Sequence, residues 1–114
     1  MIYLCSVYSL NAKTDSEEHA RIRMERYLTV MKKTKELLEQ GLVVFSPIVH
    51  CHPMSNIYGL PKHFTFWESL DKGYIDGCDE VWVLTMDGWD VSEGITKEIQ
   101  YAMDTGKPVK YTEV

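Results

Sequence analysis

Three residues within positions 88–98 (Gly-Trp-Asp-Val-Ser-Glu-Gly-Ile-Thr-Lys-Glu) have the chemistry and spacing of a ligand site: Ser92, Gly94 and Glu98. Ser92 is a favourable helix N-cap, because its hydroxyl can accept a hydrogen bond from a first-turn amide. Gly94 permits close approach of a ligand to that turn, and Glu98 adds a carboxylate six residues after the cap. Such a group suits a sugar or a phosphate. The alternative is a capped surface helix with a solvated glutamate.

Strands and helices that alternate along the chain must position these residues. Apolar runs predict strands at residues 2–5, 42–45, 80–85 and 108–111. Helical spacing and capping signals predict helices at residues 15–40, 62–76 and 92–106. The sequence therefore predicts an α/β protein.

Local signals add detail to two segments. Asp15 and Glu18 have the spacing of a capping box, and Gly41 suits the end of the first helix. Residues 48–61 contain three turn-forming residues and predict a long loop. The apolar face expected of the first helix comprises Ala20, Met24, Tyr27, Leu28, Met31 and Leu38.

The alternation of strands and helices predicts a single flavodoxin-like or Rossmann-like domain over residues 1–114. Its sheet should be mainly parallel, with four to five strands and helices on both faces. In such sheets, ligands bind beyond the carboxyl ends of the strands. Polar and aromatic residues follow three predicted strands there, and the substrate-binding candidates among them are Ser6, Tyr8, His50 and Trp89.

Composition excludes several classes of protein. The 114 residues suffice for one domain, and the net charge of −5 argues against nucleic acid polymers and anionic membranes as partners. Cys5, Cys51 and Cys78 are odd in number and widely spaced, which disfavours a disulfide framework. No signal peptide is evident, and no apolar run approaches the roughly 20 residues that cross a bilayer. We therefore expect a cytoplasmic protein.

Several motifs together resemble the nucleoside 2-deoxyribosyltransferase superfamily. The resemblance is greatest to its 2'-deoxynucleoside 5'-monophosphate N-hydrolase branch and to short, uncharacterised bacterial and phage members. It spans nearly the whole chain but depends on a few residues per motif. These are Tyr3-Leu4-Cys5 in the first strand, Asp71 ahead of Cys78-Asp79, Ser92, Gly94 and Glu98 in the last helix, then Ala102 and Gly106-Lys107-Pro108.

The resemblance implies catalytic roles for three residues. Glu98 matches the nucleophilic glutamate, which stabilises or attacks the oxocarbenium-like centre formed when an N-glycosidic bond breaks. Asp71 matches an aspartate that protonates or holds the departing base. Tyr3 matches a tyrosine that reaches the active site and orients the glutamate. Without the resemblance, Asp71 would be taken as an exposed helix residue and Tyr3 as a packed strand residue.

Ser92 bears on the choice of substrate. The resembling transferases carry an acidic residue at this place, whereas the monophosphate hydrolases carry serine, which attracts a phosphate together with first-turn amides. The charge of Glu93 opposes this assignment unless its side chain turns away. Thr96 stands where a second glycine is common in the family, and we expect it to crowd the sugar.

The expected function is hydrolysis of 2'-deoxynucleoside 5'-monophosphates to a free base and deoxyribose 5-phosphate, with no cofactor. The resembling transferases extend past the last strand, whereas this sequence stops at Val114, so hydrolysis is preferred over deoxyribosyl transfer. A non-catalytic nucleotide-binding or sensing module and a nicotinamide-dinucleotide hydrolase remain alternatives. The expected partners are a small-molecule nucleotide or nucleoside and further copies of the chain in a homo-oligomer.

Histidine and aromatic residues allow further interpretations. His50, Cys51 and His52 with His63 include zinc-ligating types, but they lack the usual spacing, so no metal is expected. Either His50 or His52 is expected to line the substrate pocket. Trp89 is the better candidate for stacking on a base. The aromatic residues of the second predicted helix are expected to pack it on the sheet, with stacking of one of them on a base as the alternative; they are Phe64, Phe66 and Trp67.

Overall fold

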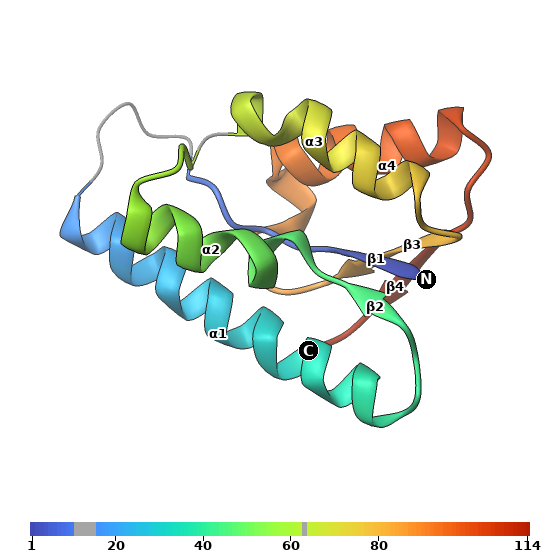
Figure 1. Ribbon diagram of the computed structural model, residues 1–114, viewed down its shortest axis with the longest axis horizontal. Coiled ribbons are helices and arrows are strands. Elements are labelled where there is room, and N and C mark those ends of the chain that lie inside the picture. The colour runs from blue at the N-terminus through green and yellow to red at the C-terminus, as the bar shows by residue number, and fades with distance from the viewer. Residues whose placement is uncertain (11–15, 63) are drawn as a thin grey trace.

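The strands form one parallel sheet whose order determines where a ligand site can lie. The computed structural model (Figure 1) describes residues 1–10, 16–62 and 64–114. Within these residues, the order is β2-β1-β3-β4, and every pair is parallel. The order reverses beside β1, because β2 lies on one side of it and β3 on the other; such a switch point is the usual ligand site of an open α/β sheet. The strands are β1 (Ile2–Cys5), β2 (Val44–Phe45), β3 (Glu80–Leu84) and β4 (Val109–Thr112).

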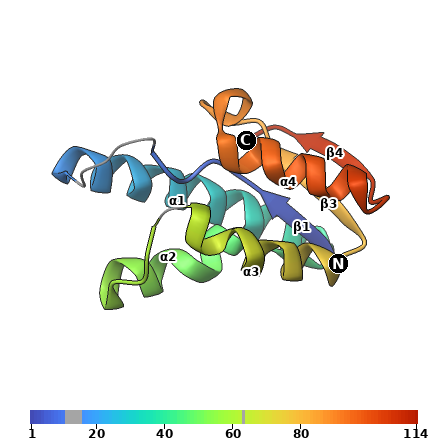
Figure 2. The same cartoon turned by 90° about the horizontal axis from the view of Figure 1, so that it is seen from above.

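Helices cover both faces of the sheet. In Figure 1, α3 and α4 lie above the strands and α1 lies below them. Figure 2 shows α3 and α4 side by side. This arrangement confirms the predicted fold class, a mainly parallel α/β domain with a Rossmann-like fold. The helices are α1 (Glu17–Glu39), α2 (Pro47–Tyr58), α3 (Phe64–Asp76) and α4 (Glu93–Asp104), with a short 3-10 turn, η1 (Trp89–Val91), before α4.

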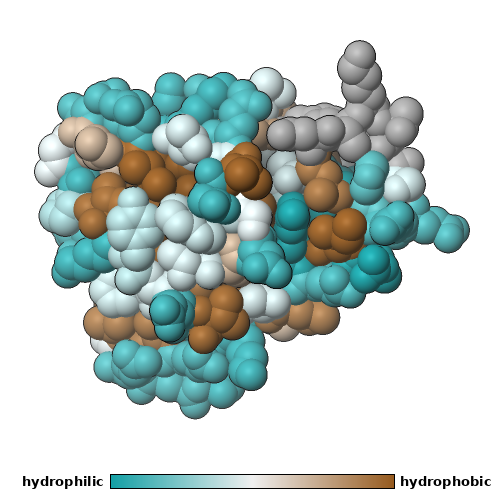
Figure 3. All heavy atoms as spheres, turned by 180° about the vertical axis from the view of Figure 1, so that it is seen from behind, coloured by the Kyte–Doolittle hydropathy of each residue, from teal (hydrophilic) through white to brown (hydrophobic). Residues whose placement is uncertain are grey.

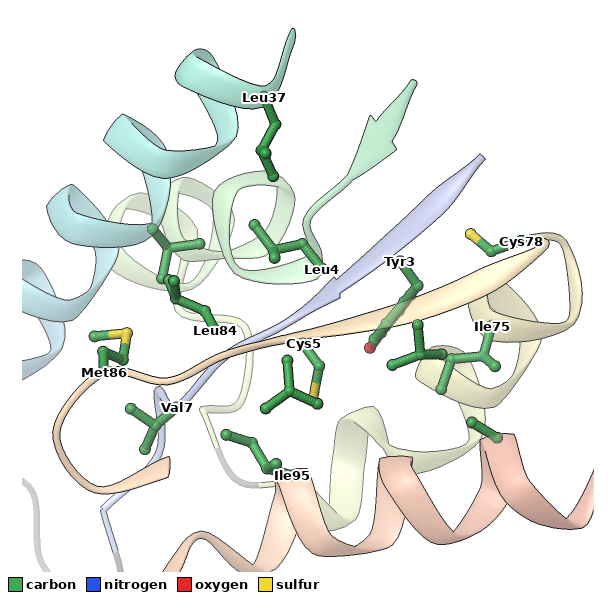
Figure 4. Packing of buried hydrophobic residues seen from close by; sticks show 14 residues of the cluster. Tyr3, Leu4, Cys5, Val7, Leu37, Ile75, Cys78, Leu84, Met86 and Ile95 are labelled. Carbon is green, nitrogen blue, oxygen red and sulfur yellow. The ribbon is translucent and has the colours of Figure 1, made fainter. Parts of the chain in front are cut away.

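The central strand β1 is buried on both faces, β3 is mostly buried, and the side chains of these two strands alternate between two parts of the core. Leu4 and Leu84 project toward α1 and approach Leu37, whereas Tyr3 and Cys5 project toward α3 and α4 (Figure 4). Each fully buried aliphatic side chain contributes about 1.5–3 kcal/mol relative to an exposed one. The core therefore holds the carboxyl ends of β1 and β3 rigidly beside the amino-terminal end of α4.

The buried face of α1 differs from the predicted face. Val30, Thr34 and Leu37 are buried, whereas Leu28 and Leu38 are 49% and 51% exposed. Thr34 can be buried because its hydroxyl donates to the carbonyl oxygen of Val30 at 2.7 Å, which satisfies its polar atom. Other exposed apolar side chains form separate brown patches on the face shown in Figure 3.

The segment predicted as a long loop is largely helical. Ser46 caps α2 by accepting from the amide of Val49, and Pro47 occupies the first turn, where its missing amide costs nothing. The helix includes Pro53 and ends at Gly59, which has a left-handed conformation with φ of 73°. The Ser-Pro pair that ends β2 therefore also begins a helix, and the prediction of a loop was wrong.

Other boundaries lie close to the predictions. Helix α1 begins after Ser16, whose hydroxyl accepts from the amide of His19. The predicted cap, Asp15, lies outside the described residues. Strand β2 is shorter than expected, since it comprises only Val44 and Phe45. Over the part of the chain that the structure describes, no helix has both the length and the apolar character needed to span a membrane.

Candidate functional site

A pocket of about 340 Å³ opens at the carboxyl edge of the sheet. This volume falls within the range of about 300–1,000 Å³ typical of small-molecule sites. Its walls come from the segment after β1, from α2 and α3, and from the first turns of α4. Six residues selected from the sequence line it together: Ser6, Tyr8, Asp71, Ser92, Gly94 and Glu98.

Two carboxyl groups are buried in this pocket. Glu98 on α4 is 8% exposed and Asp71 on α3 is 6% exposed. One oxygen of each, Glu98 Oε2 and Asp71 Oδ1, has no hydrogen-bond partner among the described residues. No lysine or arginine within those residues forms an ion pair with either group. Buried carboxyls without partners are costly, so their retention beside a cavity is typical of a functional site.

The two carboxyls perturb each other's ionisation. Burial raises the pKa of Glu98, and the nearby charge of Asp71 raises it further. The hydroxyl of Tyr3 and the thiol of Cys5 lower the pKa of Glu98 in part. Burial also raises the pKa of Asp71, while Tyr3 lowers it. The pair therefore retains a proton near neutral pH. One carboxyl can then donate a proton while the other acts as an anion.

Tyr3 lies behind the two carboxyls. It is fully buried in β1, its hydroxyl has no hydrogen-bond partner among the described residues, and it does not line the pocket. Burial raises its pKa, and the charges of Glu98 and Asp71 raise it further, so the phenol remains protonated. Tyr3 is thus placed to influence the carboxyls from within the core, as a donor and not as a base.

Ser92 has the capping role predicted for it. Its hydroxyl accepts from the amide of Ile95 at 3.2 Å, and it lines the pocket at the amino terminus of α4. Gly94 also lines the pocket, but a Cβ atom there would lie 2.9 Å from the Phe64 ring. The need for glycine at this position therefore comes from contact with Phe64, in addition to any contact with a ligand.

Two residues near Ser92, Glu93 and Thr96, each have a partner in α4 or at its N-cap. Thr96 is exposed, does not line the pocket, and donates from its hydroxyl to the Ser92 carbonyl at 2.9 Å. Glu93 lies at the pocket wall, but it pairs with Lys97 at 3.1 Å on the outer side of α4. This ion pair reduces the repulsion that Glu93 would exert on an anion.

Two predicted ligand contacts are corrected. His50 is exposed and contacts the rings of Phe45 and Tyr74 outside the pocket, whereas His52 lines it. A helix turns successive side chains by about 100°, so residues two apart point in very different directions. Trp89 packs against Tyr111 with ring centres 5.6 Å apart and does not line the pocket.

His52 has an ordered environment in the pocket wall. Its Nδ1 lies 2.5 Å from the hydroxyl of Tyr8, and its ring stacks on Tyr27. Its Nε2 is buried without a partner in the described part of the chain. Burial lowers the pKa of His52, with Arg23 and Lys62 acting in the same direction, so the ring is neutral at neutral pH.

Sequence analysis missed several residues that line the pocket. Two of them are cations, Arg26 and Lys62, and two aromatic residues expected mainly to pack α3, Phe64 and Trp67, line the pocket as well. The sequence carried no local signal for either cation, because each reaches the pocket through tertiary packing. Trp67 donates from its ring nitrogen to the Pro61 carbonyl, which fixes its indole at the pocket wall.

No metal site is evident in the described ranges, where no group of three or more histidine, cysteine, aspartate or glutamate side chains is arranged to hold an ion. His63 lies outside these residues. Cys5, Cys51 and Cys78 are buried free thiols.

The fold and the pocket define a Rossmann-like α/β domain with two buried carboxyls at the switch point of its sheet. The chain belongs to the family described as a domain of unknown function (DUF1937), whose model matches residues 1–114. Comparison with curated proteins gives no match.

Proposed function

We propose that this protein hydrolyses the N-glycosidic bond of 2'-deoxynucleoside 5'-monophosphates, releasing a free base and deoxyribose 5-phosphate. The observation that carries the proposal is the pair of buried carboxyls, Glu98 and Asp71, which share one pocket and lack ion-pair partners among the described residues. Most enzymes that break a glycosidic bond use two carboxyl groups in different catalytic roles. The resemblance to the N-hydrolase branch agrees with this chemistry.

The reaction assigns one role to each carboxyl. Asp71 donates its proton to the leaving base as the bond between base and C1' breaks, and the Glu98 carboxylate forms an ester with C1'. Water then attacks C1', the ester bond breaks, and the Glu98 carboxylate is regenerated. The proton lost by the water passes to Asp71, which restores the starting state. Burial raises the pKa of both carboxyls, so the pair can hold the one proton that the reaction needs, and the proposed mechanism uses that proton from Asp71.

The phosphate end of the proposed substrate lies at α4. Ser92 and the first-turn amides of α4 line the pocket, and helix amino termini favour anions. Glu93, the acidic residue next to Ser92, pairs with Lys97, which reduces its repulsion of a phosphate. These features support a nucleotide in preference to a nucleoside.

The direct test is the release of base from a substrate panel. Purified protein is incubated with deoxynucleoside monophosphates, the matching nucleosides and a nicotinamide dinucleotide, with and without a second base as acceptor. Chromatography then measures free base, and a reducing-sugar assay measures deoxyribose 5-phosphate. Release from monophosphates without an acceptor supports hydrolysis, and exchange that requires an acceptor identifies a transferase instead.

Binding separates catalysis from sensing. Calorimetric binding of a monophosphate without any release of base would contradict the enzyme proposal and identify a nucleotide-binding module.

We also propose that the protein acts in the cytoplasm, whose reducing conditions suit its three free thiols. A homo-oligomer is proposed as well, and light scattering tests it.

A further inference from the structure

Arg26 is a cation in the pocket wall that forms no ion pair with a carboxylate of the described residues. It lies on α1, and its Nη1 donates to the carbonyl oxygens of Tyr8 and Ser9 at 3.0 and 3.1 Å. Its Nη2 has no hydrogen bond among the described residues. Arg21 provides a contrast, because it lies one turn earlier on the same helix and pairs with Glu25 at 2.6 Å.

The environment of Arg26 favours an anionic ligand. The side chain is half-buried, and a desolvated guanidinium without a counter-charge is costly. The two carbonyl contacts fix one edge of the guanidinium, which leaves further donors for a ligand. Phosphate oxygens match this donor geometry well, because arginine binds phosphate through two parallel N–H groups.

Arg26 faces the loop that leads into α4. A Cβ atom on Gly88 would lie 3.6 Å from Arg26 Nη2 and 3.8 Å from the Val7 side chain. Gly88 precedes η1 and Ser92, and it also lines the pocket. Arg26 belongs to α1 on one face of the sheet, and its guanidinium approaches the loop that leads into α4 on the other face. This contact lies at the sheet edge where the ligand is expected.

Ser6 provides an independent indication of a ligand at this wall. It follows β1, is only 7% exposed and lines the pocket, yet its hydroxyl has no partner in the described part of the chain. A buried hydroxyl without a partner costs about 1–3 kcal/mol. Ser6 and Arg26 both line the pocket, so the hydroxyl and the guanidinium face the same cavity.

We propose that Arg26 binds the phosphate monoester of the substrate, together with Ser92 and the first-turn amides of α4. This inference rests on the proposed function and adds the residue that selects phosphorylated substrates. The guanidinium supplies the positive charge, which the neutral Ser92 hydroxyl cannot provide. A nucleoside lacks the dianion and gains nothing from Arg26.

Binding measurements test this assignment without requiring turnover. Titration calorimetry with deoxyribose 5-phosphate, and separately with inorganic phosphate, compares the wild-type protein with Arg26→Gln, Arg26→Lys and the control Arg21→Gln. We expect Arg26→Gln to weaken both affinities by roughly tenfold or more, since a charge-assisted bond is lost. Arg26→Lys should restore part of the affinity, and Arg21→Gln should leave it unchanged.

A kinetic comparison distinguishes ligand binding from a structural role. Arg26→Gln should lower kcat/KM for monophosphates, through a raised KM, much more than it lowers kcat/KM for nucleosides, whereas a structural defect would lower kcat/KM for both substrates by a similar factor. Equal losses on both substrates, unchanged phosphate affinity, or a loss caused by Lys62→Gln and not by Arg26→Gln would overturn the inference. If Arg26→Gln does not fold, the phosphate affinity of Arg26→Lys is measured in its place. A phosphate affinity of Arg26→Lys equal to that of the wild type would then overturn the inference. Phosphate binding that depends on Arg26 without base release would reject only the proposed function.

Discussion

Asp71 and Glu98 come from neighbouring helices and meet in one pocket, where each carboxyl raises the cost of ionising the other. Two such groups cannot readily both be charged, so the pair keeps one proton near neutral pH. Hydrolysis of a glycoside requires this state, because one group must donate a proton while the other stabilises a cation. The repulsion between the two carboxylates thus favours the singly protonated pair that the proposed reaction requires.

The first prediction concerns Glu98→Gln. The substitution preserves shape but removes the anion that stabilises the positive centre at C1', so turnover should fall by roughly a thousandfold or more. Release of base by chromatography measures the effect. Asp104→Asn is the matched control, since Asp104 lies on the same helix, is exposed, and accepts a hydrogen bond from Gln100 at the surface. Near-normal rates in Glu98→Gln would exclude Glu98 as nucleophile.

The second prediction is a bell-shaped pH profile of kcat/KM. Burial raises the pKa of Asp71 to about 7, and burial with the Asp71 charge raises that of Glu98 to about 8. The singly protonated pair should therefore predominate between about pH 7 and 8, and activity should decline on both sides. Asp71→Asn removes both the proton donor and the second ionisation of the pair, so the basic limb of the remaining activity should disappear while the acidic limb, set by ionisation of Glu98 beside a neutral partner, should stay close to its original pH. A profile unchanged by Asp71→Asn would contradict the coupling.

The third prediction links the same pair to stability. A carboxyl whose pKa is raised by folding stabilises the native state fully below its unfolded pKa, and this contribution is lost as pH rises through the folded pKa. For Glu98, the loss extends from about 4.5 to about 8. Glu98→Gln should therefore gain thermal stability relative to wild type, by roughly several degrees at pH 8.5 and much less at pH 5. Calorimetric melting of both proteins, with Asp104→Asn as control, measures the difference.

The parts of the site that could be predicted from sequence depend on local signals. Ser92 is a helix cap followed three residues later by the amide that it accepts from, so its role is visible in a short stretch of sequence. The apolar run at β3 likewise identifies a buried strand. Asp71 and Tyr3, by contrast, were selected through resemblance, because neither has a local pattern that marks it as functional.

The rest depends on tertiary contacts. The bond between Tyr8 and His52 joins residues 44 positions apart, and Arg26 reaches carbonyls 17 and 18 positions away. No local pattern distinguishes His52 from His50 or Arg26 from Arg21. The buried face of α1 was mistaken for a similar reason, because Thr34 is buried through a hydrogen bond to its own helix while more apolar Leu28 is exposed.

The last prediction tests the phosphate end through Ser92→Asp. Aspartate is also a good N-cap, so α4 should remain intact. Its charge would repel a phosphate and offer an acceptor to a free 5'-hydroxyl, so the preference for nucleotide over nucleoside should fall or reverse. A charge-assisted hydrogen bond is worth about 1.5–3 kcal/mol, which corresponds to roughly ten- to a hundredfold in relative kcat/KM.

Ser16→Asp is the matched control for this change, because Ser16 caps α1 in the same way but is exposed and does not line the pocket. It adds the same charge and should leave the substrate preference unchanged. Steady-state rates on one deoxynucleoside monophosphate and its nucleoside give the ratio for each protein. Equal rates on the two substrates in the unmutated protein, or a ratio that Ser92→Asp does not alter, would reduce Ser92 to a helix cap and remove the phosphate from the proposed substrate.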